Sequence, residues 1–410
     1  MPQTGELRKI RSTYRRQLLT CVRADQDISV AELSEKTRLS KPTIMKLLAH
    51  YVERGLVISV GKGSPSAIGG KPPSLYRLNA KAGFVLAFHI FPDELFCVAT
   101  DLNETDLREC SAPLSEKEGA AETVAKMALL YQEQLRELSI PPVKLIGVAI
   151  GAHGVTDSTH GVVVTSPHFP LWGENIPLRQ MFQEATGFRG SIVVDNQIRF
   201  QVYAEKARGV AQNRKNVIAV EAGIGLVAGI IVKDEIKRGV HFLAGEIGHM
   251  VLCPSDEERC PCGGRGCFEV MVSTKRIMRR MRDGAERHPS SALFTRYGAD
   301  QIVVEDLFRE SNQGDAFAML VMEETARWFA IGLWNLILAY DPEIVVIQGT
   351  YAKAGAFFLE RLRLLINEVS LPKVPRNVEI MYSTFQKQRC AIGASALMVK
   401  DYLASQAVGG

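Results

Sequence analysis

The 410-residue sequence contains no apolar run long enough to cross a membrane. Its longest apolar run, residues 328–340, has thirteen residues and includes Asn335, whereas a membrane-spanning helix needs about 20 apolar residues. The N-terminal residues are polar and basic and lack the apolar core of a signal peptide. We therefore expect a cytoplasmic protein that does not associate with a membrane.

The sequence also lacks the cysteine pattern of a disulfide framework. Five of the eight cysteines follow no common spacing, as expected for reduced thiols. These five are Cys21, Cys97, Cys110, Cys253 and Cys390. With 46% hydrophobic and 23% charged residues, the composition is that of a soluble globular protein. The length exceeds that of one typical domain, so we expect two or three domains, each with its own core.

Positive charge is concentrated at one end of the chain. Residues 1–81 contain fifteen Lys and Arg and only six Asp and Glu, a balance of +9. Because the whole chain carries +4, residues 82–410 carry −5. A small basic head on a mildly acidic body predicts a polyanionic partner for the head alone.

Residues 1–81 have the pattern of a winged helix-turn-helix DNA-binding domain. An amphipathic basic helix over residues 7–22 precedes a short helix that begins with a capping box formed by Ser29 and Glu32. A third helix follows Ser40, and strands at 56–60 and 74–78 would form the wing. We expect the third helix to enter the major groove of double-stranded operator DNA. A basic protein-binding module is the alternative.

The DNA-contacting residues of the head are predicted from the exposed start of its third helix. They are Ser40, Lys41, Thr43 and Lys46. Some of these side chains would contact phosphates, which position the domain without reading sequence. The basic segment 61–73 is a wing tip or the start of a linker, and its Gly-Lys-Gly-Ser run lacks the spacing of a Walker A phosphate loop.

Four metal-ligand residues lie close together in the second half of the chain. They are His249, Cys260, Cys262 and Cys267. Glycines between the cysteines allow a tight fold that aims three sulfurs at one point, and a Cys3His set is typical of zinc. Four protein ligands leave no open position for a catalytic water, so we predict one structural zinc ion per chain. Unpaired core thiols or a disulfide are the alternatives.

Two carboxylates flank these ligands without being needed for the metal. Glu246 lies three residues before His249, and Glu269 lies two residues after Cys267. A metal that holds the loop also holds these carboxylates, and a metal-bound imidazole keeps its second nitrogen free to donate a hydrogen bond. We therefore predict a pocket for a polyhydroxylated ligand. Surface glutamates on a metal-bound loop are the alternative.

The pattern from Glu246 to Glu269 resembles the signature of the ROK family. The matching elements are Glu-x-Gly-His at 246–249 and Cys-x-Cys-Gly-x-x-Gly-Cys-x-Glu at 260–269. This family contains bacterial sugar kinases and sugar-responsive transcriptional repressors. Residues 70–72, Gly-Lys-Pro, resemble the Gly-Arg-Pro of related repressors, which can reach a minor groove, so Lys71 joins the predicted DNA contacts.

Residues 82–410 have the pattern of an α/β body. Strands expected at 84–90, 95–100, 144–150, 191–194, 217–220, 227–232 and 344–347 are interspersed with helices expected at 120–138, 196–208 and 317–338. The pattern alone does not select a topology. The family resemblance implies two ribonuclease H-like, or actin-like, lobes and a zinc loop at 245–269, preceded by the winged helix-turn-helix.

Two departures from the family pattern favour a sensor over a kinase. Family kinases have a glycine-rich Asp-x-Gly-Gly-Thr turn for ATP phosphates, but residues 89–93 read His-Ile-Phe-Pro-Asp, which lacks those glycines. The general base of the kinases is an aspartate in an Asn-Asp-x-Asn segment, and Gln197 stands at that position. An amide has no useful basicity, so a sugar could be held without activation. An alignment shifted by two residues would place Asp195 there instead.

These observations predict a sugar-responsive transcriptional regulator that is not an enzyme, a repressor released or modulated by its carbohydrate ligand. The predicted residues for sugar hydroxyls are Asn196, Gln197, Glu246, His249 and Glu269. We expect a homodimer, which can pair into a tetramer, on an operator of two half-sites. The alternatives are an ATP-dependent sugar kinase with an added DNA-binding domain and a regulator controlled by a protein partner.

Overall fold

The computed structural model describes residues 3–25, 27–63, 72–223, 225–298, 301–368, 378–385 and 388–408, with side chains described from residue 12 onward. The chain divides into two compact units. Unit 1 contains Met1–Asp195 and Ala394–Gly410, and unit 2 contains Asn196–Gly393. The predicted boundary between residues 81 and 82 falls inside unit 1 and stays a prediction. Within the described residues, no helix has the length and apolar character that a membrane crossing requires.

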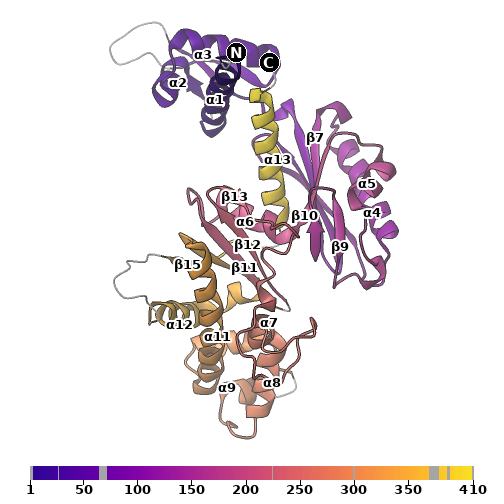
Figure 1. Cartoon of the computed structure of the whole chain (residues 1–410), viewed down its shortest axis with the longest axis vertical. Helices are drawn as coiled ribbons and strands as arrows, with labels where there is room; N and C mark the ends of the chain where they lie inside the picture. Colours follow the sequence, from indigo (N-terminus) through magenta and orange to yellow (C-terminus); the bar gives the residue numbers. More distant parts are fainter. Residues whose placement is uncertain are drawn as a thin grey trace. The chain divides into compact units, whose positions relative to one another are not determined.

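The N-terminal head is a winged helix-turn-helix, as predicted (Figure 1). Its elements are α1 (Gln3–Ala24), β1 (Ile28–Ser29), α2 (Val30–Thr37), α3 (Lys41–Glu53), β2 (Val57–Lys62) and β3 (Ser74–Leu78). Ser29 and Glu32 form the expected capping box, which starts α2 by satisfying free backbone amides. The wing has a third strand that the sequence did not reveal, because β1 pairs with β3 over only two residues.

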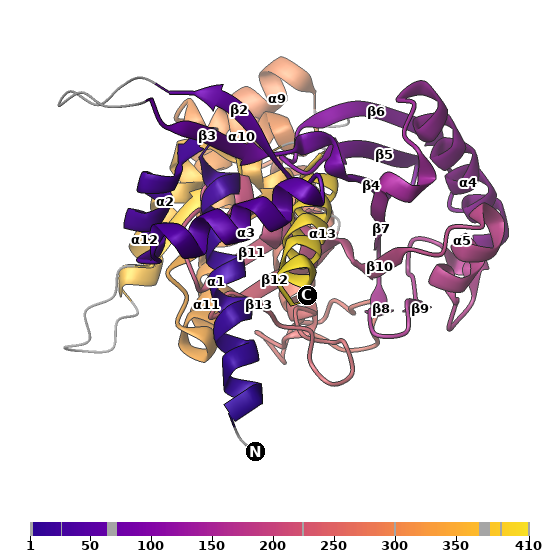
Figure 2. The same cartoon turned by 90° about the horizontal axis from the view of Figure 1, so that it is seen from above.

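A five-stranded sheet forms the body of unit 1. Its strands are β4 (Phe84–Ile90), β5 (Glu94–Asp101), β6 (Asp106–Pro113), β7 (Leu145–Ala152) and β10 (Ser191–Asn196). They lie in the order β10-β7-β4-β5-β6. Strand β5 is antiparallel to both β4 and β6, and β7 is parallel to β4. Helices α4 (Ala120–Glu137) and α5 (Leu178–Thr186) cover one face, and the later part of α13 (Arg389–Val408) lies on the other (Figures 1 and 2).

The sheet of unit 2 repeats this strand order. Its strands are β11 (Val217–Ala222), β12 (Leu226–Val232), β13 (Glu235–Ile236), β14 (Ile344–Gly349) and β15 (Glu379–Tyr382). They lie in the order β13-β12-β11-β14-β15. Strand β12 is antiparallel to both β13 and β11, and β14 is parallel to both β11 and β15. Counted from the first strand of each sheet, both sheets have the order 3-2-1-4-5. The expected pair of ribonuclease H-like lobes is therefore confirmed.

The helices of unit 2 build its core against this sheet. They are α6 (Gln197–Arg208), α7 (Phe268–Val272), α8 (Thr274–Gly284), α9 (Ala292–Tyr297), α10 (Val304–Asn312), α11 (Ala316–Tyr340) and α12 (Gly355–Glu368). Helix α6 packs closely on β12 because Gly229 has no side chain. A Cβ there would lie 2.4 Å from the carbonyl oxygen of Ile198. This glycine therefore serves helix packing, and its presence does not indicate a phosphate site.

A short hairpin and a turn complete unit 1 beside the first sheet. The hairpin consists of β8 (Val155–Asp157) and β9 (Val162–Thr165), which are antiparallel. A single turn of 3-10 helix follows at Pro170–Trp172, where the rings of Phe169 and Trp172 stack at 4.8 Å between centroids. Both rings are buried in the core of this lobe.

Candidate functional site

The four predicted metal ligands converge in unit 2. One ligand atom from each of His249, Cys260, Cys262 and Cys267 lies within 4.8 Å of the other three. The Cys260 sulfur lies 3.6 Å from His249 Nδ1, and the sulfurs of Cys262 and Cys267 are 3.7 Å apart. All eight cysteines are free thiols, so the cluster is assembled without a disulfide. The arrangement could hold one metal ion, with His249 facing it through Nδ1.

Backbone contacts fold this loop back on itself. The amides of Leu252 and Cys253 donate to the carbonyl of Gly266 at 2.7 and 3.2 Å, and the amide of Phe268 donates to Met250 at 2.7 Å. Gly266 has a positive φ of 64°, and a Cβ there would lie 1.7 Å from the carbonyl oxygen of Cys253. Only glycine fits this position, which brings Cys267 back toward His249.

The two flanking glutamates lie beside strand β12. The amide of Leu226 donates to Glu269 Oε2 at 3.1 Å, and the amide of Ala228 donates to the carbonyl of Gly245 at 2.8 Å, just before Glu246. Both glutamates are half-buried. Burial raises the pKa of the Glu246 carboxyl above its ordinary value, against the opposing effects of His249 and Arg199. These carboxylates are hydrogen-bond acceptors held close to the metal loop.

Asn196 and Gln197 start helix α6, where both are buried. The Asn196 side chain caps the helix by accepting from the amide of Ile198 at 3.0 Å. The amide group of Gln197 donates to Glu221 Oε2 at 3.3 Å and accepts a short hydrogen bond from Gln201. The Gln197 side chain is thus held on both sides by neighbours within unit 2.

Arg199 joins this helix to the metal-side segment, a role that the sequence prediction missed. It is 2% exposed, and its Nη2 donates to the carbonyl of Phe242 at 2.6 Å. It also lowers the pKa of Glu246. The available signal was an arginine only two residues after Gln197, in a helix next to the predicted site. A buried arginine needs hydrogen-bond acceptors, and these can come from another segment of the chain.

The turn between β4 and β5 is surrounded by rings. His89 lies against Phe91 with 3.7 Å between ring centroids and against His153 with 5.8 Å. His153 in turn lies 4.9 Å from His168. Burial lowers the pKa of His153 to about 4, with a further contribution from His168, so its imidazole is neutral at pH 7. Bulky rings thus stand where a phosphate-binding turn would have glycines.

Helix α3 presents an exposed face in the head. Ser40 caps the helix by accepting from the amide of Thr43 at 3.4 Å, and the two hydroxyls lie 2.8 Å apart. Lys41 and Lys46 are exposed, as predicted, whereas Lys71 lies outside the described residues. Met45, which the prediction omitted, is 61% exposed beside Lys46.

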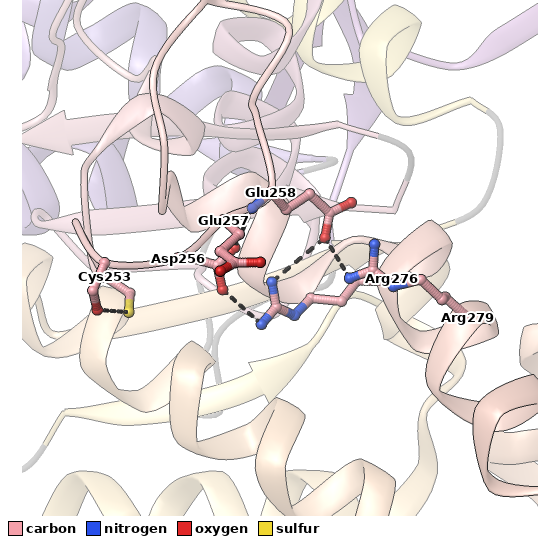
Figure 3. A pocket seen from close by; sticks show the side chains of 7 residues that line it. Cys253, Asp256, Glu257, Glu258, Arg276 and Arg279 are labelled. Atoms are coloured by element: carbon pink, nitrogen blue, oxygen red, sulfur yellow. Dashed lines mark hydrogen bonds and ion pairs between the residues drawn. The ribbon is translucent and has the colours of Figure 1, made fainter.

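A hollow of about 680 Å³ lies beside the metal loop and is lined by ion pairs (Figure 3). Arg276 forms ion pairs with Asp256 at 2.9 Å and with Glu258 at 3.5 Å, and Arg279 pairs with Glu258 at 2.7 Å. The Arg276 hydrogen bond holds the pKa of Asp256 below its ordinary value. These pairs connect the metal loop to helix α8.

Two ribonuclease H-like lobes, a Cys3His cluster and a winged helix-turn-helix define a DNA-binding protein with an actin-like body. The chain belongs to the ROK family, whose profile matches residues 96–401. A profile described as a winged helix-turn-helix DNA-binding domain matches residues 11–58. The family prediction made from the metal-loop signature is therefore confirmed.

Known members of both branches of the family are similar to the chain. A xylose repressor from Caldicellulosiruptor bescii is 25% identical, covering 92% of this chain and 92% of its own. A glucokinase from Halalkalibacterium halodurans is 28% identical, covering 70% of this chain and 86% of its own. The crystal structure of a ROK family transcriptional regulator, described as a homologue of the E. coli MLC protein, gives a TM-score of 0.81 at 23% identity, covering 97% of this chain and 99% of that one.

Proposed function

We propose that the protein is a sugar-responsive, DNA-binding transcriptional repressor that does not phosphorylate its ligand. The observation that carries the proposal is that Gln197, a buried amide hydrogen-bonded to Glu221 and Gln201, stands at the family's general-base position. An amide can hold a hydroxyl but cannot take its proton. The rings of His89 and Phe91 at the β4–β5 turn add a second obstacle, because ATP phosphates need small residues and free amides there.

The shifted alignment, with Asp195 as the base, is less well supported. Asp195 is fully buried in strand β10, before the helix begins, whereas Asn196 and Gln197 occupy its N-cap and first turn. The motif places an asparagine directly before the base, and Asn196 directly precedes Gln197. A full-length similarity to a xylose repressor also supports the regulatory role.

The metal ion is proposed to be zinc in a structural role. Zinc–sulfur and zinc–nitrogen bonds of about 2.3 and 2.1 Å place tetrahedral ligands roughly 3.5 to 3.8 Å apart. The separations of 3.6 and 3.7 Å in the cluster match these values. With four protein ligands, the ion would supply no activated water, and its role would be to hold the loop that carries the pocket carboxylates.

Sugar hydroxyls would be recognised from this loop and from helix α6. Glu246 and Glu269 supply carboxylate acceptors, and His249 can donate through Nε2 because its Nδ1 faces the metal cluster. Asn196 and Gln197 complete the proposed set. A ligand that lacks one of the expected hydroxyls would leave a half-buried carboxylate unpaired, which makes recognition selective.

Operator DNA would be bound by two heads of a homodimer, one for each half-site. The basic charge of the head supports this partner, as does the exposed face of α3 with Lys41 and Lys46. The sugar would change operator affinity only if it binds the DNA-competent and DNA-free conformations with different affinities.

The proposal is tested by ligand binding and phosphoryl transfer on the full-length protein. A sugar at about 100 times its dissociation constant should add roughly 2.7 kcal/mol to the free energy of unfolding, measured by thermal shift across a sugar panel. With Mg-ATP and the same sugar, no sugar phosphate should form. Turnover near the enzyme median of about 10 per second would show a kinase. If no sugar in the panel raised the unfolding temperature, control by a protein partner would be favoured.

A further inference from the structure

Two cysteines that the metal site does not use lie directly opposite each other in the sheet of unit 1. Cys97 on β5 pairs with Cys110 on β6 in the antiparallel register. Directly opposed residues of such a pair have Cα atoms about 4.5 or 5.5 Å apart. Both separations lie within the range of about 4.4 to 6.8 Å that a disulfide spans. The strand register therefore places the two residues at a Cα separation that is compatible with a disulfide.

The two thiols differ in access. Cys97 is fully buried in the core of the lobe, whereas Cys110 is half-buried. Cys110 lies on β6, which is the last strand of its sheet. A small oxidant can therefore approach Cys110 from the edge of the sheet. Cys97 lies one strand further in and is not accessible to solvent.

The surroundings of the two thiols shift their pKa values in opposite directions. The hydrogen bond from the Cys97 thiol lowers the pKa of Cys110, and the guanidinium of Arg108 lowers it further. Burial raises the pKa of Cys97 well above its ordinary value. Gln134 holds this corner in place by donating to the carbonyls of Arg108 at 3.1 Å and Cys97 at 3.5 Å. Cys110 is thus the reactive thiol and Cys97 a protonated neighbour.

We propose that Cys97 and Cys110 form an oxidisable dithiol site, which a hydroperoxide converts into a cross-strand disulfide. The Cys110 thiolate attacks the terminal peroxide oxygen, and the oxygen–oxygen bond breaks to release an alcohol or water. The Cys97 sulfur then attacks the resulting sulfenic acid, and water leaves as the disulfide forms. Two thiols are oxidised and one peroxide is reduced, so the electrons balance.

This site is separate from the metal loop and does not depend on the proposed sugar or DNA binding. The dithiol lies in unit 1, whereas the four metal ligands lie in unit 2. Because the disulfide would join strands that are already paired, the fold should be retained. Closing the loop between the two strands should raise the unfolding temperature of the oxidised protein.

Peptide mapping of the full-length protein after treatment with one equivalent of hydrogen peroxide tests the proposal. Trypsin separates the two cysteines by cutting after Arg108, into peptides 82–108 and 109–117. We expect these peptides to appear as a linked pair, two hydrogens lighter than their sum, and to separate on reduction with dithiothreitol. Peptides 260–265 and 266–275 report the metal-loop thiols in the same digest.

Two variants check the order of events. In Cys97→Ser, Cys110 should accumulate as a sulfenic acid that dimedone traps, because its resolving partner is gone. In Cys110→Ser, Cys97 should remain reduced. The proposal is overturned if the wild-type protein retains both thiols while the metal-loop thiols oxidise, or if Cys110 proceeds to a sulfinic acid without forming the link.

Discussion

Gly266 shows how strongly one backbone position controls the metal loop. Its φ of 64° costs other residues about 1–2 kcal/mol, and an added Cβ would collide with the Cys253 carbonyl at 1.7 Å. We expect Gly266→Ala to lower the free energy of unfolding by more than about 2 kcal/mol and to release the metal. Urea unfolding and metal content after gel filtration measure both effects.

Gly263 provides the matched control. Its φ is also positive, at 90°, but no atom lies within 4 Å of the position that a Cβ would take. Gly263→Ala should therefore cost only the conformational part, about 1–2 kcal/mol, and should retain the metal. Equal loss of metal in both variants would contradict the assigned role of the Gly266–Cys253 contact.

At the scale of single elements, helix α3 is the predicted reading helix of the head. Lys46 is exposed on it, and a phosphate contact there would contribute to affinity without reading sequence. Lys46→Ala should weaken binding to all DNA sequences and reduce the slope of log affinity against log salt by about 0.9. Fluorescence anisotropy at several salt concentrations measures this slope.

Lys36→Ala removes the same charge from a different helix of the head. Lys36 lies on α2, where it forms an ion pair with Asp25 at 2.8 Å. Because this lysine is already paired within the head, its loss should leave the salt slope unchanged. If both variants reduced the slope equally, the effect would come from net charge and not from the face of α3.

At the scale of the whole molecule, helix α13 belongs to both units. Its first residues lie in unit 2, where Arg389 donates to Glu221 at 3.5 Å, and its end lies in unit 1. There Arg54, the C-cap of α3, donates to Gln406 Oε1 at 2.6 Å. Glu221 also contacts Gln197, so the start of this helix is hydrogen-bonded to a neighbour of the proposed sugar site.

Gln406→Ala should therefore reduce the effect of the sugar on operator affinity more than it reduces the binding of the sugar itself. We expect sugar affinity to be retained and the sugar-induced change in operator affinity to shrink by roughly 2- to 10-fold, since one hydrogen bond is worth about 0.5–1.5 kcal/mol. Operator titrations with and without sugar give this ratio. Ser405→Ala is the control, because the Ser405 hydroxyl bonds only within the helix: it donates to the Tyr402 carbonyl at 2.6 Å and accepts from Gln406 Nε2 at 3.4 Å, so its loss leaves the bond between Gln406 Oε1 and Arg54 in place. If operator affinity fell but the ratio of affinities with and without sugar stayed the same, Gln406 would only stabilise the head and would not transmit the effect of the sugar.

Features that depend on near neighbours in the chain were predictable from the residues. The Ser29–Glu32 capping box, the Ser40 cap and the Cys3His spacing all involve groups within about twenty residues of one another, and the structure shows each of them. The short strand β1 was missed because two residues give no periodic pattern. Arg199 was missed because its acceptor on Phe242 lies more than forty residues away.

The residues of the sequence by themselves therefore determined the family and the Cys3His cluster, because these follow from residue type and spacing. The repeated 3-2-1-4-5 sheets, the support of Glu269 by Leu226 and the pairing of Cys97 with Cys110 came only from folding. Strand order and register depend on which distant segments bury apolar surface together. No spacing within the chain records that choice.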